Sequence, residues 1–272
     1  MPCQPPVSRG ILSVLIVDEL RSPLGSLEVI LKTGIREAPC DAMMIVMVKK
    51  KAVVRGKSEL RRISQIVEIL SDEYRGAECA LVHENAFQLL MATILSAQCT
   101  DVRVNMVTPI LFEQYPGPRE LAAAEILEVE GIIRSTGFYR NKAKSLVGAA
   151  STIVNDFGGE VPDTMEGLLR LPGVARKTAN VVLGTWFGIA SGIVVDTHVS
   201  RISQRLGLTE LTKPVPIERD LMDKLGQDCW IDFSHWVIHH GRRICAARKP
   251  KCDRCVVLDL CPYFSSNIKS SS

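Results

Sequence analysis

The chain has 272 residues, of which 46% are hydrophobic and 23% are charged, and its formal net charge is +3. This composition is typical of a globular protein with one large domain or two modest ones. No apolar run approaches the roughly 18 residues that a membrane-spanning helix needs, so the sequence predicts a soluble protein. The small positive charge permits nucleic-acid binding, but only the positions of the charges can argue for it.

The nine cysteines do not indicate a secreted disulfide scaffold. Their number is odd, and no segment combines the charged, apolar and small-residue regions of a signal peptide. A reducing compartment and a cysteine-ligated metal explain them better. We therefore expect a cytoplasmic protein.

Residues 1–57 are predicted to be an N-terminal extension, disordered or without function. Their two short apolar runs lack a helical period, and their acidic residues argue against a mitochondrial presequence. Within the extension, Met47 stands shortly before three consecutive lysines, a pattern that resembles the start of a bacterial protein. The serine-rich residues 265–272 are predicted to be a disordered tail.

From Ser58 onward, apolar residues recur at helical spacing. Phe87–Leu95 is almost continuously apolar, which predicts a helix buried on all sides. Proline and glycine mark short links between the stretches, and Ile193–Val195 is the one short run typical of a strand. We therefore predict an all-α fold, with helices near residues 61–70, 87–95, 102–115, 119–129, 142–157, 165–171, 177–186, 199–206, 217–225 and 233–241.

The last four cysteines fall within seventeen residues in the pattern C-x6-C-x2-C-x5-C. They are Cys245, Cys252, Cys255 and Cys261. Thiolates this close in sequence can converge on tetrahedral zinc or on a [4Fe–4S] cluster. One C-x2-C knuckle with a long arm on each side favours the wider cluster, and zinc stays the alternative. The scattered cysteines, Cys99 and Cys229 among them, are expected to be small buried hydrophobes.

The loop that carries these cysteines is also basic. A run of charge is usually a solvated face. Cations on a loop pinned by a cluster could however meet a phosphate backbone without an ordering cost. We therefore predict DNA contacts by Arg248, Lys249 and Lys251.

Leu168–Ala179 predicts a helix, a tight hairpin and a second helix. Proline and glycine at positions 172 and 173 end the first helix, because one cannot continue it and the other accepts a positive φ. The N–H groups that open the second helix then form a phosphate site. This is a helix-hairpin-helix DNA-binding motif, and its expected contact residues are Pro172, Gly173, Val174, Ala175 and Arg176.

The hairpin, together with Val195–His198 and the four cysteines, resembles the endonuclease III family of the helix-hairpin-helix superfamily. The similarity covers roughly residues 59–264 and includes Leu95–Gln98 and Gly137–Tyr139. It implies a bifunctional DNA glycosylase and abasic-site lyase that carries a [4Fe–4S] cluster. Its partner would be double-stranded DNA with a damaged base or an abasic site, and the enzyme would act as a monomer.

The resemblance also implies two helical domains with the DNA-binding cleft between them. A six-helix barrel with the helix-hairpin-helix would span residues 79–189, and residues 58–78 and 190–264 would form the iron–sulfur cluster domain. One departure from the family pattern is Ala175, which stands where the hairpin usually has a second glycine. A left-handed alanine would cost about 1 kcal/mol, so we expect Ala175 in helical geometry.

Lys177 is predicted to lie in the first turn of a helix. The helix dipole disfavours a cation there and so favours the neutral amine that a nucleophile needs. From the residues alone, a solvent lysine beside a phosphate is an equal reading, and Asp196 is an N-cap. The resemblance implies that Lys177 is the Schiff-base nucleophile and Asp196 the catalytic carboxylate, with strand cleavage by β-elimination.

Such chemistry requires an extrahelical base. The resemblance implies that Gln98 fills the vacated stack and that Phe138 is a second wedge; the alternatives are a polar helix end and a core aromatic. Packing is expected for His235, His239 and His240. The resemblance further implies pocket or water-positioning roles for Ser96, Asp101 and His198.

Two other functions fit parts of the sequence. A monofunctional glycosylase, such as those of the mismatch adenine glycosylase family, lacks the lysine and adds a C-terminal domain, whereas this chain has Lys177 and ends eleven residues after Cys261. A non-catalytic DNA-binding redox protein would use only the hairpin and the cluster. The bifunctional enzyme is favoured, and the resemblance implies oxidised pyrimidines as its substrates.

Overall fold

The computed structural model describes residues 56–267. The predicted N-terminal extension, apart from its last two residues, and residues 268–272 of the predicted tail lie outside the described residues. Between residues 56 and 267 every regular element is helical, and Ile193–Val195 forms no strand. The predicted all-α fold is therefore confirmed, and no helix in the described part of the chain is long and apolar enough to cross a membrane.

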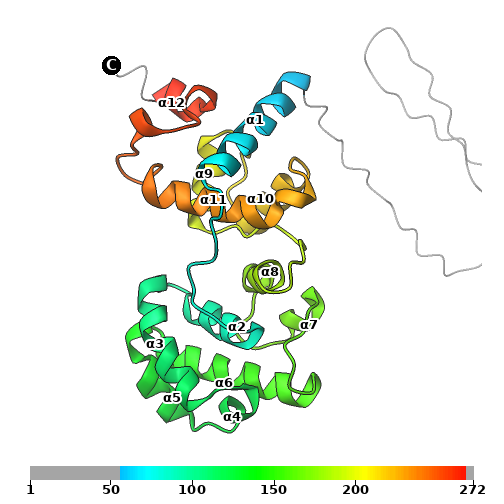
Figure 1. Ribbon diagram of the computed structural model, residues 1–272, viewed down its shortest axis with the longest axis vertical. Coiled ribbons are helices and arrows are strands. Elements are labelled where there is room, and N and C mark those ends of the chain that lie inside the picture. The colour runs from blue at the N-terminus through cyan, green and yellow to red at the C-terminus, as the bar shows by residue number, and fades with distance from the viewer. Residues whose placement is uncertain (1–55, 268–272) are drawn as a thin grey trace, which may run out of the picture. The chain divides into compact units, whose positions relative to one another are not determined.

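The helices follow the predicted order (Figure 1). Residues 119–129 were expected to form one helix but form parts of two, because Glu125 is extended and separates them. The α-helices are α1 (Lys57–Glu73), α2 (Ala86–Leu95), α3 (Asp101–Gln114), α4 (Pro118–Ala122), α5 (Ile126–Ile133), α6 (Tyr139–Asp156), α7 (Met165–Leu169), α8 (Arg176–Thr185), α9 (Thr197–Arg205), α10 (Pro214–Met222), α11 (Trp230–Arg243) and α12 (Pro262–Asn267). Short 3-10 turns lie at η1 (Arg134–Thr136), η2 (Gln227–Cys229), η3 (Cys252–Arg254) and η4 (Leu258–Leu260).

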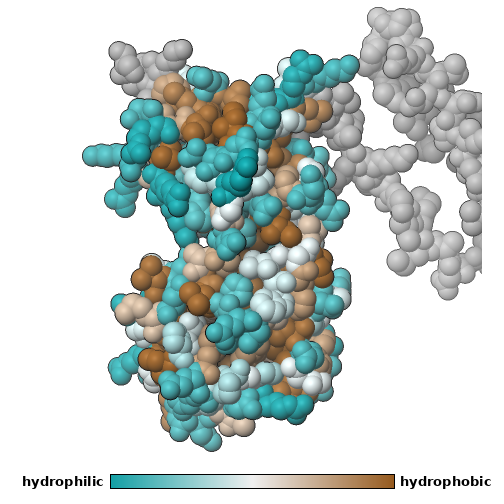
Figure 2. All heavy atoms as spheres, in the orientation of Figure 1, coloured by the Kyte–Doolittle hydropathy of each residue, from teal (hydrophilic) through white to brown (hydrophobic). Residues whose placement is uncertain are grey.

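The described helices enclose two hydrophobic cores. The first core draws on residues 79–187, from α2 to α8, which we call the barrel lobe. The second draws on α1 and residues 193–261, which we call the cluster lobe. In Figure 1 the two groups lie at opposite ends, with α8 on the side of the barrel lobe that faces the cluster lobe, and in Figure 2 the surface narrows between the two groups.

Helix α2 is the centre of the barrel lobe. It begins at Asn85, whose side chain accepts a hydrogen bond from the Gln88 N–H, and it packs against α3, α6 and α8. Its residues from Leu89 to Leu95 are all buried, so the prediction of a helix buried on all sides is confirmed. Packing on three sides explains why its apolar residues show no single stripe.

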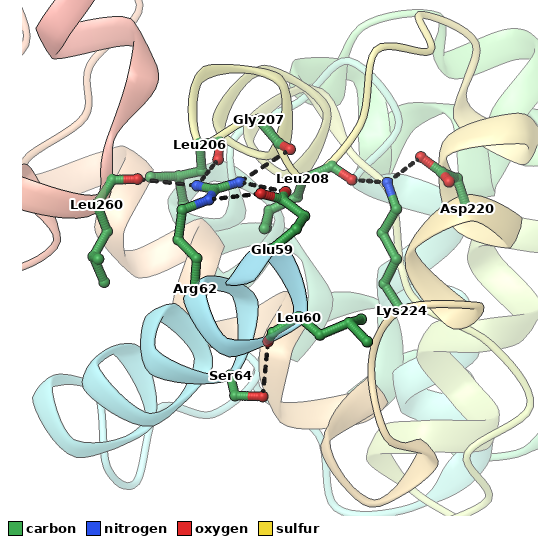
Figure 3. Close-up of polar contacts among 10 residues, drawn as sticks. All are labelled: Glu59, Leu60, Arg62, Ser64, Leu206, Gly207, Leu208, Asp220, Lys224 and Leu260. Carbon is green, nitrogen blue, oxygen red and sulfur yellow. Dashed lines mark hydrogen bonds and ion pairs between the residues drawn. The ribbon is translucent and has the colours of Figure 1, made fainter. Parts of the chain in front are cut away.

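Polar side chains tie the cluster lobe together (Figure 3). Arg62 on α1 donates to the carbonyl oxygens of Leu206 at 2.8 Å and Leu260 at 3.0 Å. Lys224 donates to the Leu208 carbonyl and to the Asp220 carboxylate. The two Arg62 bonds join α1 to segments 144 and 198 positions away in sequence and satisfy carbonyls at the ends of α9 and η4.

Candidate active site and cluster site

A cavity of about 210 Å³ lies between the barrel lobe and the cluster lobe. Its wall includes Lys177 from α8 and Asp196, the residue before α9, which are 19 positions apart in sequence. The rest of the wall comes from α2, α8 and α11, from Asp101 at the start of α3, and from the segments that precede α2 and α9. The structure therefore brings the two predicted catalytic residues to one cavity, with one residue from each lobe.

The hairpin before α8 places Lys177 at the start of that helix. Gly173 has φ +79°, and a Cβ there would lie 2.6 Å from the Cβ of Ser145, so both backbone and space require glycine. Ala175 has φ −102° and ψ 169° and is the N-cap of α8, without a side-chain hydrogen bond. The expectation of helical geometry at Ala175 is wrong: the residue is extended, which alanine adopts without strain.

The hairpin residues divide between surface and core. Pro172, Gly173 and Ala175 are exposed, whereas Val174 packs into the core of the barrel lobe. The Arg176 side chain turns toward α10, where its Nε donates to the buried Glu218 carboxylate at 2.8 Å. This partner raises the pKa of the Arg176 guanidinium. A phosphate at the hairpin would therefore meet mainly backbone N–H groups, as the motif requires.

Asp196 is held in one orientation by α9. Its Oδ1 accepts from the backbone N–H groups of His198 and Val199, both at 2.8 Å, and its Oδ2 lies 3.0 Å from His198 Nδ1. The N-cap interpretation is thus correct, and the same carboxylate faces the cavity. His198 is a partner of Asp196 and is not part of the cavity wall.

Gln98 and Phe138 lie in exposed loops outside the cavity wall. Gln98 follows α2 with φ 53°, and Phe138 precedes α6 with φ 49°. Phe138 is 65% exposed, so it is not a core aromatic. Among the described non-glycine residues, only these two and Lys249 have positive φ. All three are predicted DNA contacts, and strained backbone of this kind concentrates at functional sites.

Several other side chains complete the cavity wall. Ser96 and Asp101 line it as predicted, and Asp101 accepts a hydrogen bond from Arg242 of α11 at 2.5 Å. His235 and His239 also line the cavity, so the prediction that these two side chains serve in packing is incomplete. Their i, i+4 spacing on one helix face was the signal available in the sequence. His240, by contrast, is buried and lies 2.9 Å from the Tyr74 hydroxyl.

The four clustered cysteines line one small, largely apolar cavity in the cluster lobe. Burial, together with the charges of the other three cysteines, raises the pKa of the Cys255 thiol to about 11. Arg205 Nη1 donates to Cys245 Sγ at 3.2 Å, and His240 Nε2 lies 3.7 Å from Cys255 Sγ. No group of three or more Cys, His, Asp or Glu between residues 56 and 267 is arranged around a single metal ion. Four thiols that share one cavity, with N–H groups beside the sulfurs, fit an iron–sulfur cluster.

The other predicted residues of the cluster loop are exposed. They are Arg248, Lys249 and Lys251. Arg205 fixes the start of the loop through the carbonyl oxygens of Ala246 and Ala247, at 2.8 and 3.0 Å. Of the scattered cysteines within the described residues, Cys79, Cys99 and Cys229 are partly buried against the two cores.

Comparisons with known proteins decide the family. Residues 91–227 match the HhH-GPD superfamily base excision DNA repair protein family, and residues 245–261 match the iron-sulfur binding domain of endonuclease III. Endonuclease III of Synechocystis sp. is 57% identical over 75% of this chain and 94% of its own length. The chain belongs to the endonuclease III family.

Solved structures agree with the endonuclease III assignment. A non-covalent endonuclease III–DNA complex is 40% identical, with a TM-score of 0.74, over 77% of this chain and 98% of that one. A trapped endonuclease III–DNA covalent intermediate is also 40% identical, with a TM-score of 0.73, over 78% and 99% of the two chains. The protein is therefore a base-excision repair DNA glycosylase with abasic-site lyase activity, and it carries a [4Fe–4S] cluster, not zinc.

Proposed function

We propose that Lys177 is the nucleophile and Asp196 the carboxylate that stabilises positive charge on the sugar. The observation that carries this assignment is their meeting at one cavity, at the start of the helix that follows the hairpin. The lobes of this chain bind double-stranded DNA between them, and the damaged nucleotide rotates out of the stack to reach the cavity.

The reaction follows from these positions. As the glycosidic bond breaks, positive charge develops on the sugar, and the fixed Asp196 carboxylate stabilises it without having to reorient. The Lys177 amine forms a bond to C1′, and the base leaves with the electrons of the glycosidic bond. The resulting iminium acidifies the C2′ proton, and its removal expels the 3′ phosphate by β-elimination. Hydrolysis of the iminium then returns the lysine.

The other predicted residues position the DNA. Gln98 fills the space that the extruded base leaves, and Phe138 enters beside it. The exposure of both side chains and the positive φ of both residues support these roles. The hairpin N–H groups and the exposed cations of the cluster loop, Arg248, Lys249 and Lys251, contact phosphates. Cys245, Cys252, Cys255 and Cys261 hold the cluster, which when bound fixes the shape of this loop. Ser96 and Asp101 contact the extruded base, and His198 orients Asp196.

The substrate class, state and location belong to the same proposal. Oxidised pyrimidines are the substrates, and the protein acts as a monomer on the nucleoid in a bacterial-type cytoplasm. The domain division proposed is 79–189 for the barrel, with 58–78 and 190–264 for the cluster domain. The two separate cores support this division.

Borohydride trapping tests the nucleophile. The native protein should form a covalent adduct with abasic duplex DNA, and Lys177→Ala should form none. Lys57→Ala, at an exposed lysine of α1, is the matched control and should trap at the native rate. Adduct formation by Lys177→Ala would overturn the assignment. Repeating the native reaction on duplexes with oxidised pyrimidines, oxidised purines and mismatches tests the substrate class.

A further inference from the structure

Lys142 is a buried lysine that takes no part in the cavity. It lies on α6 in the barrel lobe and is 5% exposed. Its Nζ donates to the carbonyl oxygens of Leu95 and Thr136, both at 2.8 Å. Burial lowers the pKa of its ammonium group. A buried ammonium is costly unless it is hydrogen-bonded, so this placement needs an explanation beyond packing.

The two carbonyls belong to the two loops that carry the proposed wedges. Leu95 is the last residue of α2, three positions before Gln98. Thr136 is the last residue of η1, two positions before Phe138. The backbone N–H of Lys142 also donates to the Phe138 carbonyl at 3.1 Å. One residue therefore binds both loops at the positions from which their wedges emerge.

Both wedge residues depend on such support. A non-glycine residue in the left-handed region is strained and persists only when its surroundings hold it. The backbone hydrogen bonds around Gln98 are short-range: the Ala97 N–H donates to the Ile94 carbonyl at 3.4 Å, and the Cys99 N–H donates to the Ser96 carbonyl at 3.1 Å. These local bonds shape one turn but do not relate it to the other loop.

The chemistry of lysine suits the position. An ammonium group has three donors, enough to serve two carbonyls from different segments. Its charge also lies at the C-terminal end of α2, where the helix dipole favours a cation. A methionine would fill the same space without either property, and it would leave two buried carbonyls without this donor.

We propose that Lys142 is a positioning residue that fixes the spacing of Gln98 and Phe138, so that both enter duplex DNA together. This role rests on the proposed function of the two wedges. It predicts a loss confined to steps that open a duplex, because single-stranded abasic DNA has no stack to fill.

The experiment compares two rates in one protein. Base release from a thymine glycol duplex requires the wedges, whereas borohydride trapping on single-stranded abasic DNA does not. In Lys142→Met the duplex rate should fall on the order of 10-fold or more, since small misplacements of positioning groups reach this size. The single-strand rate should stay within about twofold. Lys144→Met is the matched control, at an exposed lysine two positions along α6. It removes a charge from the same helix, so any effect of lost charge should be equal on both rates and leave their ratio unchanged.

A double-mutant cycle separates positioning from general damage to the fold. In a Gln98→Ala, Phe138→Ala background, adding Lys142→Met should cause little further loss of the duplex rate, because its effect passes through the missing wedges. An equal loss on duplex and single-stranded DNA, or full additivity in the cycle, would overturn the role. If Lys142→Met does not fold, the same ratio is measured in Lys142→Gln, which removes the charge and shortens the side chain; an unchanged ratio there overturns the role.

These outcomes are distinct from failure of the proposed function. If Lys177 is not the nucleophile, Lys177→Ala still traps on single-stranded DNA. If the wedges are misassigned, the Gln98→Ala, Phe138→Ala protein itself keeps the native duplex rate. Only a change in the ratio of the two rates, lost in the wedge-free background, supports Lys142.

Discussion

The barrel lobe and the cluster lobe are stabilised in different ways. The barrel lobe contains a dense aliphatic core in which Leu89, Leu90 and Leu95 are fully buried. The cluster lobe has its own core, but residues 244–261 contain only 3-10 turns and irregular chain. There the chain is fixed by side chains that bind carbonyl oxygens, Arg62 and Arg205 among them. Packing therefore determines one lobe, whereas polar anchors and ligated cysteines determine much of the other.

This difference bears on the active site because each lobe contributes one of the two proposed catalytic residues. Lys177 lies on a helix that packs against α2 and α7 in the barrel lobe. Asp196 caps a helix that packs against α11 in the cluster lobe. The position of the proposed nucleophile thus depends on the aliphatic core of the barrel lobe, and that of the proposed catalytic carboxylate depends on the cluster lobe.

The largest expected effect tests the carboxylate apart from the cap. Asp196→Asn removes the charge, but asparagine caps a helix about as well as aspartate. The rate of base release should fall about 100-fold or more, and thermal stability should change by less than about 0.5 kcal/mol. Single-turnover base release and thermal unfolding measure the two quantities.

Asp196→Ala is the companion variant to Asp196→Asn. It removes the hydrogen bonds to the His198 and Val199 N–H groups as well as the charge. Its stability should therefore fall by about 1 kcal/mol. A base-release rate within threefold of native in Asp196→Asn would show that the carboxylate only caps α9.

Removing the iron should loosen the cluster lobe and leave the barrel lobe nearly unchanged. After chelation under reducing conditions, amides of residues 245–261, and of α9 and α11 beside them, should exchange on the order of 10-fold faster or more, because ligand loss opens local structure. Amides of α2 and α6 should stay within about twofold of native. Hydrogen exchange read by mass spectrometry distinguishes these regions. Equal loosening of both lobes would contradict the proposed domain division.

Local patterns were sufficient to predict much of this arrangement. The apolar run of α2, the Pro-Gly break of the hairpin and the cysteine spacing each act over fewer than twenty residues, and the structure or the comparisons confirm the helix and the cluster. The predicted ends of the helices were less exact, because the residue at which a helix begins depends on single positions such as Asn85 and Glu125. The break between α4 and α5 had no proline or glycine to mark it.

The contacts between distant segments could not be predicted from such patterns. Lys142 looks like any solvent lysine in sequence, and only the tertiary structure places its ammonium between two loop carbonyls. Arg176 looked like a phosphate contact, yet its partner Glu218 comes from a helix 42 positions away. The roles of Lys177 and Asp196 were predicted only through resemblance, since a helix-start lysine and an N-cap aspartate are both ordinary.

Arg62→Met tests the polar anchors of the cluster lobe. The variant keeps the side-chain stem but removes the donors to the Leu206 and Leu260 carbonyls. Stability should fall by about 1–3 kcal/mol, because two partly buried acceptors lose their partner. Arg75→Met is the matched control at a side chain that is 83% exposed, and its effect should be near zero. Equal effects of the two substitutions, measured by chemical denaturation, would show that the anchors contribute little.

The smallest expected effect concerns the ion pair that joins the lobes. Asp101 opens α3 in the barrel lobe, and Arg242 lies near the end of α11 in the cluster lobe; their side chains are 23% and 43% exposed. Water screens a pair this accessible, so a double-mutant cycle with Asp101→Asn and Arg242→Gln should give a coupling below about 1 kcal/mol that shrinks with added salt. The Arg75–Asp72 pair, 83% and 67% exposed, gives the baseline. A coupling above about 2 kcal/mol that persists in high salt would mean that this ion pair holds the lobes together. The two lobes would then unfold as one unit and would not respond separately to loss of iron.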